Sequence, residues 1–149
     1  MNPFRIALAN VRFPETPEES IMLAEHAIAQ ASIERAGVIC FPECFVPGYR
    51  RVGKKMPPPN PGFLERAWSA IAAAAAKAGL AVVLGTERVV DNVDGALLAA
   101  ALVIHRDGTI AGFQDKVQLD PSEDASYSPG SGRQVFQTGS AQIWRCDLP

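Results

Sequence analysis

The sequence has few cysteines, almost no net charge and no long apolar stretch. Its three cysteines, Cys40, Cys44 and Cys146, are odd in number and lack CxxC spacing, which indicates neither a disulfide framework nor a zinc site. With 14 Lys and Arg against 16 Asp and Glu, no overall field draws the chain to nucleic acid or to an anionic membrane. The longest apolar stretches, residues 71–76 and 96–104, are far shorter than the ~20 residues of a spanning helix. The N-terminus shows no basic segment followed by an apolar one, so we expect a soluble cytoplasmic protein with no nucleic-acid or membrane partner.

The first part of the chain alternates strand and helix signals. Its 149 residues, 48% of them apolar, suit one domain with a sizeable core. Residues 5–11 are a short apolar run, which predicts a buried strand. The capping box in Thr16-Pro17-Glu18-Glu19 begins a helix, and Gly37 is expected to end it in a left-handed conformation. Residues 38–41 predict a second buried strand, so this run reads as a parallel βαβ unit.

A loop rich in proline and cationic residues separates this unit from the next helix. The loop covers residues 47–61, and we expect its basic cluster of Arg50, Arg51, Lys54 and Lys55 to form a solvated face. Asn60-Pro61 can cap a helix that Gly79 closes. Apolar runs then predict strands at residues 80–85, 97–104 and 109–114, and Asp107-Gly108 predicts a hairpin between the last two. A further extended run covers residues 134–138.

Three charged residues are candidates for chemistry. Glu43 directly follows a predicted strand in Phe41-Pro42-Glu43, where a carboxylate partly shielded from water can act as a general base. Lys116 follows the predicted strand at residues 109–114, and Glu123 lies in a polar loop. Each residue, taken alone, also fits a solvated charge at a strand end or in a loop.

The order of these residues and the short motifs around them resemble the N-terminal half of proteins of the nitrilase, or carbon-nitrogen hydrolase, superfamily. The resemblance rests on the opening strand with Ala7 to Asn10, on Phe41-Pro42-Glu43 with Pro47-Gly48-Tyr49, on Lys116-Val117-Gln118-Leu119, and on Glu123, Tyr127, Pro129-Gly130 and Val135-Phe136. These motifs cover most of the chain in the family's order.

The resemblance implies an α/β fold, the N-terminal half of a nitrilase-like αββα sandwich, with residues 1–140 as the N-terminal part of a carbon-nitrogen hydrolase domain. It also implies a Glu-Lys-Cys triad in which Glu43 is the general base and Lys116 stabilises the tetrahedral oxyanion. Glu123 and Tyr49 would position the substrate, and Glu123 would also position the lysine. The family acts on small-molecule amides or nitriles, uses no metal or organic cofactor, and forms homo-oligomers at full length.

Residues 141–149 diverge from the family pattern of an apolar, glycine-containing strand that ends in Ile-Cys. Cys146 lies two positions early relative to Phe136 and follows Trp144-Arg145. Codons for residues 141–149, read one nucleotide later, allow Leu-(Lys/Arg)-Phe-Gly-Val-Ala-Ile-Cys, with the thiol at the level of Leu148. The code forces the glycine and the basic residue when Arg145 and Leu148 use CGN and CTN codons. We therefore hypothesise a frameshift just after Ser140 and a tail that replaces the nucleophile strand.

Two classes of function stay open at this point. The chain is either a carbon-nitrogen hydrolase product that is truncated before its nucleophile and inactive alone, or a non-catalytic binding or interaction module that keeps part of the fold. Cys40 lies inside a predicted strand, and Cys44 is too close along the backbone to receive in-line help from Glu43. Thiol-dependent turnover would favour the enzyme.

Overall fold

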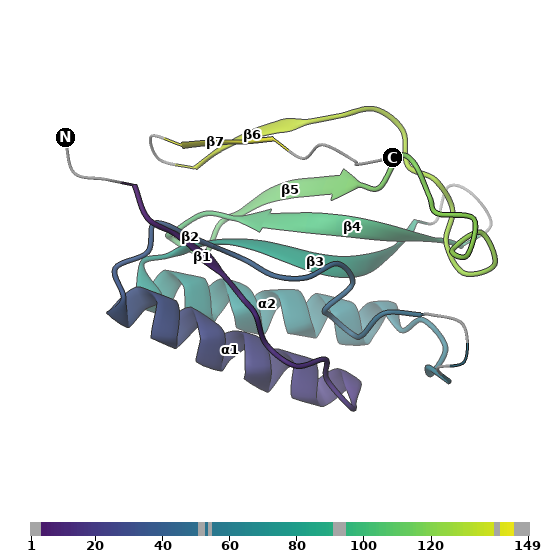
Figure 1. The fold of residues 1–149 in the computed structure, drawn as a ribbon, viewed down its shortest axis with the longest axis horizontal. Helices are drawn as coiled ribbons and strands as arrows, with labels where there is room; N and C mark the ends of the chain where they lie inside the picture. The colour runs from purple at the N-terminus through teal and green to yellow at the C-terminus, as the bar shows by residue number, and fades with distance from the viewer. Residues whose placement is uncertain (1–3, 51–52, 54, 91–94, 139–140, 145–149) are drawn as a thin grey trace.

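The computed structural model describes residues 4–50, 53, 55–90, 95–138 and 141–144. A five-stranded sheet in the order β1-β2-β3-β4-β5 forms its centre. The strands are β1 (Ile6–Leu8), β2 (Val38–Cys40), β3 (Ala81–Val90), β4 (Ala96–Ile104) and β5 (Ile110–Asp115). Helices α1 (Pro17–Ile33) and α2 (Pro61–Ala78) lie side by side on one face of the sheet, and β6 (Val135–Thr138) and β7 (Ala141–Trp144) pair with each other on the side away from the helices (Figure 1).

The sheet changes from parallel to antiparallel at β3. Strands β1, β2 and β3 are parallel neighbours joined through α1 and α2, which confirms the predicted βαβ unit. Strands β3, β4 and β5 are antiparallel. The predicted hairpin at Asp107-Gly108 is also confirmed, because the His105 amide donates to the Thr109 carbonyl at 2.8 Å where β4 turns into β5. The carboxyl ends of β2 and β5 both lead into the segments that carry the candidate residues.

Helix α1 begins as its sequence predicts but ends differently. The Thr16 hydroxyl accepts from the Glu19 amide at 3.2 Å, whereas the Glu19 carboxylate accepts from the Glu15 amide at 2.6 Å and so closes the cap one residue earlier. The expectation that Gly37 takes a left-handed conformation is wrong: Arg35 has the positive φ, 56°. Gly37 instead lies against Phe4, and a Cβ there would lie 2.5 Å from the ring of this half-exposed side chain.

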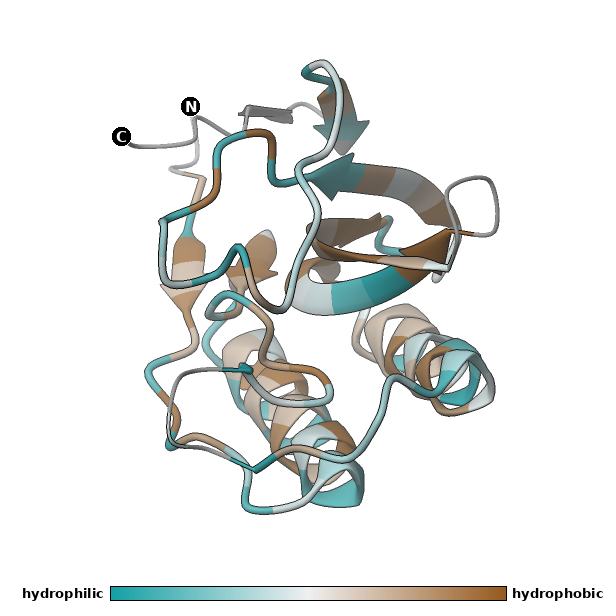
Figure 2. Ribbon diagram, turned by 90° about the vertical axis from the view of Figure 1, so that its right-hand side faces the viewer, coloured by the Kyte–Doolittle hydropathy of each residue, from teal (hydrophilic) through white to brown (hydrophobic). Residues whose placement is uncertain are grey.

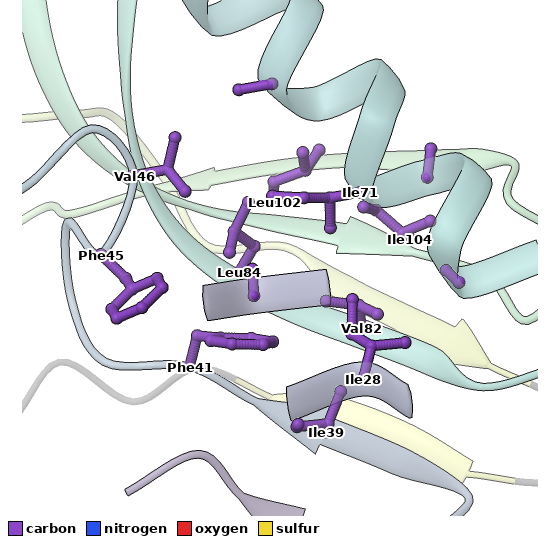
Figure 3. Packing of buried hydrophobic residues seen from close by; sticks show 14 of the residues in the cluster. Ile28, Ile39, Phe41, Phe45, Val46, Ile71, Val82, Leu84, Leu102 and Ile104 are labelled. Atoms are coloured by element: carbon purple, nitrogen blue, oxygen red, sulfur yellow. The ribbon is translucent and has the colours of Figure 1, made fainter. Parts of the chain in front are cut away.

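The main core lies between the helices and the sheet. Ile28 and Ile71 project from the helices, and Leu84, Leu102 and Ile104 project from β3 and β4 to meet them (Figure 3). All five are essentially inaccessible, and burying each side chain stabilises the fold by about 1.5–3 kcal/mol. Hydropathy colouring shows the strands as largely apolar and the helices as mixed (Figure 2), as expected for a sheet covered by amphipathic helices.

The first strand is more exposed than its apolar sequence predicts. Ile6 and Leu8 are 58% and 78% exposed, and only Ala7 packs against the core, so the expectation of a buried strand is wrong. The reason is tertiary: β1 is an edge strand that pairs with β2 alone, and nothing in the described part of the chain covers its outer face. Neither described helix is long and apolar enough to cross a membrane.

Candidate active site

Glu43 lies in a tight turn that packs directly on β3. The Val46 amide donates to the Gly85 carbonyl and the Glu87 amide donates to the Val46 carbonyl, both at 3.1 Å. Gly85 makes this approach possible, because a Cβ there would lie 1.9 Å from the Pro42 carbonyl oxygen. The turn that carries Glu43 is therefore held against β3.

Lys116 is the first residue after β5, and its backbone is fixed on both sides. Its amide donates to the Ala99 carbonyl of β4, and its carbonyl accepts from the Gly130 amide, each at 2.8 Å. A Cβ on Gly130 would lie 2.4 Å from the Asp115 Cβ, so glycine is required for this close approach as well. The aliphatic stem of Lys116 thus leaves the sheet at a defined point.

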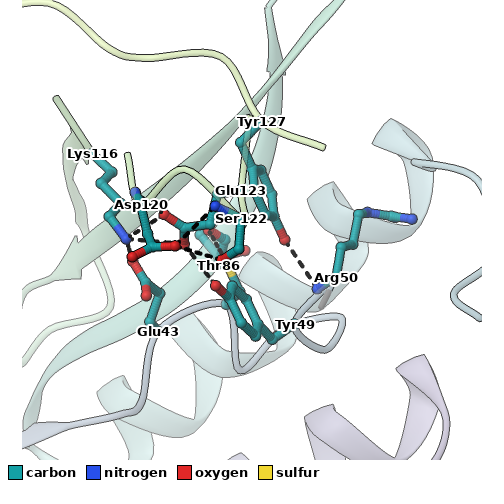
Figure 4. Close-up of polar contacts among 10 residues, drawn as sticks. Glu43, Tyr49, Arg50, Thr86, Lys116, Asp120, Ser122, Glu123 and Tyr127 are labelled. Carbon is teal, nitrogen blue, oxygen red and sulfur yellow. Dashed lines mark hydrogen bonds and ion pairs between the residues drawn. The ribbon is translucent and has the colours of Figure 1, made fainter. Parts of the chain in front are cut away.

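The structure brings all four predicted site residues together (Figure 4). Lys116 Nζ lies 3.1 Å from Glu43 Oε1, and it lies 2.9 Å and 2.8 Å from Oε1 and Oε2 of Glu123. The Tyr49 hydroxyl donates to Glu123 Oε1 at 2.8 Å, and the Asp120 amide donates to Oε2 at 2.7 Å. The Lys116 ammonium therefore bridges the carboxylates of Glu43 and Glu123. The Glu123 carboxylate is also held by the Tyr49 hydroxyl and the Asp120 amide.

The two carboxylates differ in their access to water. The Glu123 side chain is 1% exposed and Lys116 is 16% exposed, whereas Glu43 is 35% exposed. Burial alone would lower the pKa of Lys116, but its hydrogen bonds with Glu123 and Glu43 outweigh burial and raise that pKa. Burial opposes ionisation of Glu123, yet the donors Lys116 and Tyr49 hold the pKa of this carboxyl below its ordinary value. The cluster therefore keeps a charged ammonium beside an accessible carboxylate.

Behind this cluster lies a buried ion pair that sequence reasoning missed. Arg50 was expected on a solvated loop face, and this is wrong: its side chain is 13% exposed and pairs with the fully buried Glu87 of β3. Tyr127 was named in the sequence analysis only as part of the family motif. Its hydroxyl donates a hydrogen bond to Glu87 Oε1 at 2.8 Å. The sequence signal for this pair was Glu87 in the mostly apolar segment 81–90. A carboxylate that is buried in a strand needs a charged or hydrogen-bonding partner, so this position predicted one. Arg51 and Lys54 lie outside the described residues.

The cysteines of the described residues do not form a reactive thiol at this cluster. Cys44 is fully buried with a positive φ of 46°, and burial raises the pKa of its thiol to about 12. Cys40 belongs to β2, and burial raises its pKa as well. Cys146 lies outside the described residues. Within the described part of the chain, no group of three or more His, Cys, Asp or Glu side chains could hold a metal ion.

Comparisons with known proteins identify the relatives of this arrangement. The family model of the carbon-nitrogen hydrolases matches residues 5–145. The NitN amidase from Nesterenkonia sp. AN1 has 26% sequence identity and a TM-score of 0.76, with 94% of this chain and 55% of that chain covered. A mutant of an amidase from the same source, which shows acrylamide added to its active-site cysteine, has 24% identity and a TM-score of 0.75, with 94% and 55% covered.

A more distant similarity concerns the fold alone. A glutamine-dependent NAD+ synthetase from Acinetobacter baumannii has 21% identity and a TM-score of 0.78, with 93% of this chain and 26% of that chain covered. The comparison with curated proteins finds no match. The chain spans about half the length of the amidases it resembles, and the mixed sheet with two helices matches their nitrilase-like α/β fold.

Proposed function

The chain belongs to the carbon-nitrogen hydrolase family, and on this premise we propose that Glu43 and Lys116 are the general base and the oxyanion-stabilising residue of a hydrolase for small amides. The observation that carries the proposal is the 3.1 Å contact between Lys116 Nζ and Glu43 Oε1 at a point where Glu43 is still accessible to solvent. An amide is the substrate class that the amidase relatives favour over a nitrile.

The proposed chemistry divides a difficult hydrolysis into two steps. The Glu43 carboxylate takes the proton of a cysteine thiol, and the thiolate attacks the amide carbon to form a tetrahedral oxyanion. The Lys116 ammonium stabilises this negative charge, and Glu43 returns the proton to the leaving amine as the C–N bond breaks. Water activated by Glu43 then cleaves the thioester, which releases the acid and regenerates the thiol. Both charged groups required for this sequence are already in contact in the structure.

Glu123 and Tyr49 serve this proposed site mainly by holding Lys116. Glu123 is almost completely buried, and both of its oxygens accept hydrogen bonds from Lys116, with Tyr49 and the Asp120 amide as additional donors. A carboxylate engaged in this way fixes an ammonium in place and has little surface left for a substrate. Tyr49 contributes to substrate positioning through its ring, which lies beside the same cluster.

The nucleophile is the part of the triad that we propose this chain lacks. Cys44 is buried and hardly ionised, and Cys40 lies within a strand, so neither described cysteine suits the role. The shifted reading of residues 141–149 allows a cysteine at the level of Leu148. We therefore propose a tail translated out of frame after Ser140 and no amide turnover by the 149-residue chain. As in the amidase relatives, a complete enzyme is expected to use a cysteine thiol.

A paired activity assay tests this proposal. Ammonia release from acrylamide and simple aliphatic amides is measured for the 149-residue chain and for the chain obtained by deleting one nucleotide at the Ser140/Ala141 junction. We expect no thiol-dependent release from the first and release from the second. Glu43→Gln in the second chain should slow release at least about 100-fold, because the general base is lost. Glu25→Gln, an exposed change on α1, is the matched control.

Each contrary outcome identifies the part of the proposal that fails. Undiminished release after Glu43→Gln would contradict the role of Glu43 as the base. Activity of the 149-residue chain that disappears on Cys146→Ala would overturn the frameshift and make Cys146 the nucleophile. Two well-folded chains without turnover would favour the alternative, a non-catalytic binding or interaction module.

A further inference from the structure

Glu87 is a buried carboxylate that the proposed reaction does not use. It is fully inaccessible on β3, and its oxygens accept from Arg50 Nε at 2.7 Å and Arg50 Nη2 at 3.1 Å. Tyr127 contributes a third donor at 2.8 Å. A buried carboxylate with a two-pronged guanidinium partner and a phenol partner fixes those side chains in one geometry. Glu87 thus determines where both partners lie.

We call Glu43, Tyr49, Lys116 and Glu123 the Lys116 cluster. The two partners of Glu87 belong to the segments that carry Tyr49 and Glu123. Arg50 directly follows Tyr49, whose hydroxyl donates to Glu123. Tyr127 ends the turn that starts at Glu123, because its amide donates to the Glu123 carbonyl at 2.9 Å. The Arg50 amide also donates to the Tyr127 hydroxyl at 3.3 Å, so the two segments are joined to each other as well as to β3.

The tyrosine rings show that this arrangement is continuous with the Lys116 cluster. Tyr49 and Tyr127 lie nearly parallel, with ring centroids 6.3 Å apart and an interplanar angle of 10°. One hydroxyl reaches Glu123 and the other reaches Glu87. Figure 4 shows both rings close to Glu123. A displacement of either segment would therefore change the contact between Tyr49 and Glu123.

We propose that Glu87 is a positioning residue that holds the segments of Tyr49 and Glu123 against β3 and thereby sets the orientation of Lys116. This inference rests on the proposed function for the importance of Lys116, but its geometric content stands apart from turnover. The Glu87 carboxylate is bonded to Arg50 and Tyr127 and not to the Lys116 ammonium. Its action passes through Arg50 and Tyr127 to the hydrogen bond between Tyr49 and Glu123.

The experiment uses the fact that the chain has two tyrosines. The 149-residue chain is labelled with carbon-13 at the tyrosine Cζ, and Tyr127→Phe assigns the signal of Tyr49. Burial and the hydrogen bond to Glu123 raise the pKa of Tyr49 in the wild type. Glu87→Gln keeps the size of the side chain but leaves Arg50 without a charged partner, so we expect the Cζ signal of Tyr49 at pH 7 to shift as its hydroxyl loses the hydrogen bond to Glu123.

The control breaks a neighbouring ion pair that does not reach the cluster. Arg88→Gln removes the partly buried pair between Arg88 and Asp115, which joins β3 to β5. It should lower the thermal midpoint and leave the Cζ signal of Tyr49 at pH 7 unchanged. If Glu87→Gln fails to fold, Arg50→Lys is used, because it keeps the charge but loses the two-pronged geometry and should produce the same change at Tyr49.

The remaining outcomes separate this inference from the proposed function. A folded Glu87→Gln or Arg50→Lys chain with an unchanged Tyr49 Cζ signal overturns the inference, whatever the activity assay gives. A shifted Tyr49 Cζ signal supports it even if the chain obtained by the one-nucleotide deletion shows no turnover. In an active chain obtained by the one-nucleotide deletion, Glu87→Gln should lower kcat at least tenfold because Lys116 is displaced, and it should also raise KM because the Tyr49 segment moves with it.

Discussion

Lys116 and Glu43 meet at one rim of the sheet, with Nζ 3.1 Å from Oε1, although they follow different strands. The strands concerned, β2 and β5, are not neighbours, since β3 and β4 lie between them. The contact exists because the turn after β2 folds back onto β3 and because Lys116 extends from the end of β5 toward it. The Lys116–Glu123 pair then brings a second carboxylate to the same ammonium, 2.8 Å from Nζ.

The ionisation of Glu123 should make stability depend on pH in a defined way. The pKa of Glu123 is held below the ordinary value of 4.5. Its contribution to the free energy of unfolding is therefore present above pH 4.5 and is lost as pH falls through the folded pKa. Lys116, with a pKa raised above 10.5, contributes fully below pH 10.5 and loses its contribution at higher pH. Glu123→Gln should therefore cost about 3 kcal/mol near pH 7, and this cost should shrink as pH falls from 4.5 through the folded pKa.

Urea unfolding of both chains at several pH values measures this difference. Glu25→Gln serves as the control and should change the free energy of unfolding by less than about 0.5 kcal/mol. A Glu123→Gln penalty that stays constant from pH 3 to pH 7 would show that the ion pair does not contribute.

Gly85→Ala should displace the turn that carries Glu43. The new Cβ would lie 1.9 Å from the Pro42 carbonyl oxygen and 2.8 Å from the Glu43 Cα, and both are backbone atoms that cannot rotate away. We expect a loss of about 3 kcal/mol in the free energy of unfolding. Gly62→Ala in α2 is the matched control, because its nearest neighbours are side-chain atoms at 3.5 Å or more. Equal denaturation midpoints for Gly85→Ala and the wild type would contradict the close packing.

Cys44 should be unreactive in the folded chain. Its pKa of about 12 leaves only about one thiol in ten thousand ionised at pH 8. In a Cys40→Ser, Cys146→Ser background, Ellman's reagent should react with Cys44 slowly in buffer and rapidly in guanidinium chloride. Rapid labelling of the folded chain would mean that Cys44 is accessible and would reopen it as a nucleophile beside Glu43.

The exposed edge strand predicts self-association of the isolated chain. Leu8 is 78% exposed on β1, which pairs with one neighbour only, and open strand edges with apolar side chains associate readily. Leu8→Lys should shift the sedimentation profile toward monomer at micromolar concentration. Ile33→Lys, which changes a 73% exposed residue at the end of α1, should have a smaller effect. Monodisperse wild-type chain that unfolds cooperatively would argue against this prediction.

Local signals in the sequence were sufficient to predict most of the elements. The Thr16 and Asn60 caps, Gly79 and the Asp107-Gly108 turn act through hydrogen bonds and backbone angles within a few residues, and the structure shows each as expected. The end of α1 is the exception. There Arg35, and not Gly37, takes the positive φ, and Gly37 lies against the Phe4 ring.

The tertiary structure alone decided which charges meet and which apolar residues stay exposed. The sequence by itself determined the alternation of strands and helices and the positions of Glu43 and Lys116 after their strands. Only the tertiary structure showed that Glu87 and Arg50 are buried together. An ion pair between a loop and a strand produces no hydrophobic periodicity in the sequence of either segment. Likewise, Ile6 and Leu8 read as core residues, yet their exposure depends on what covers the edge of the sheet, and this is set by the whole fold and not by the strand's own sequence.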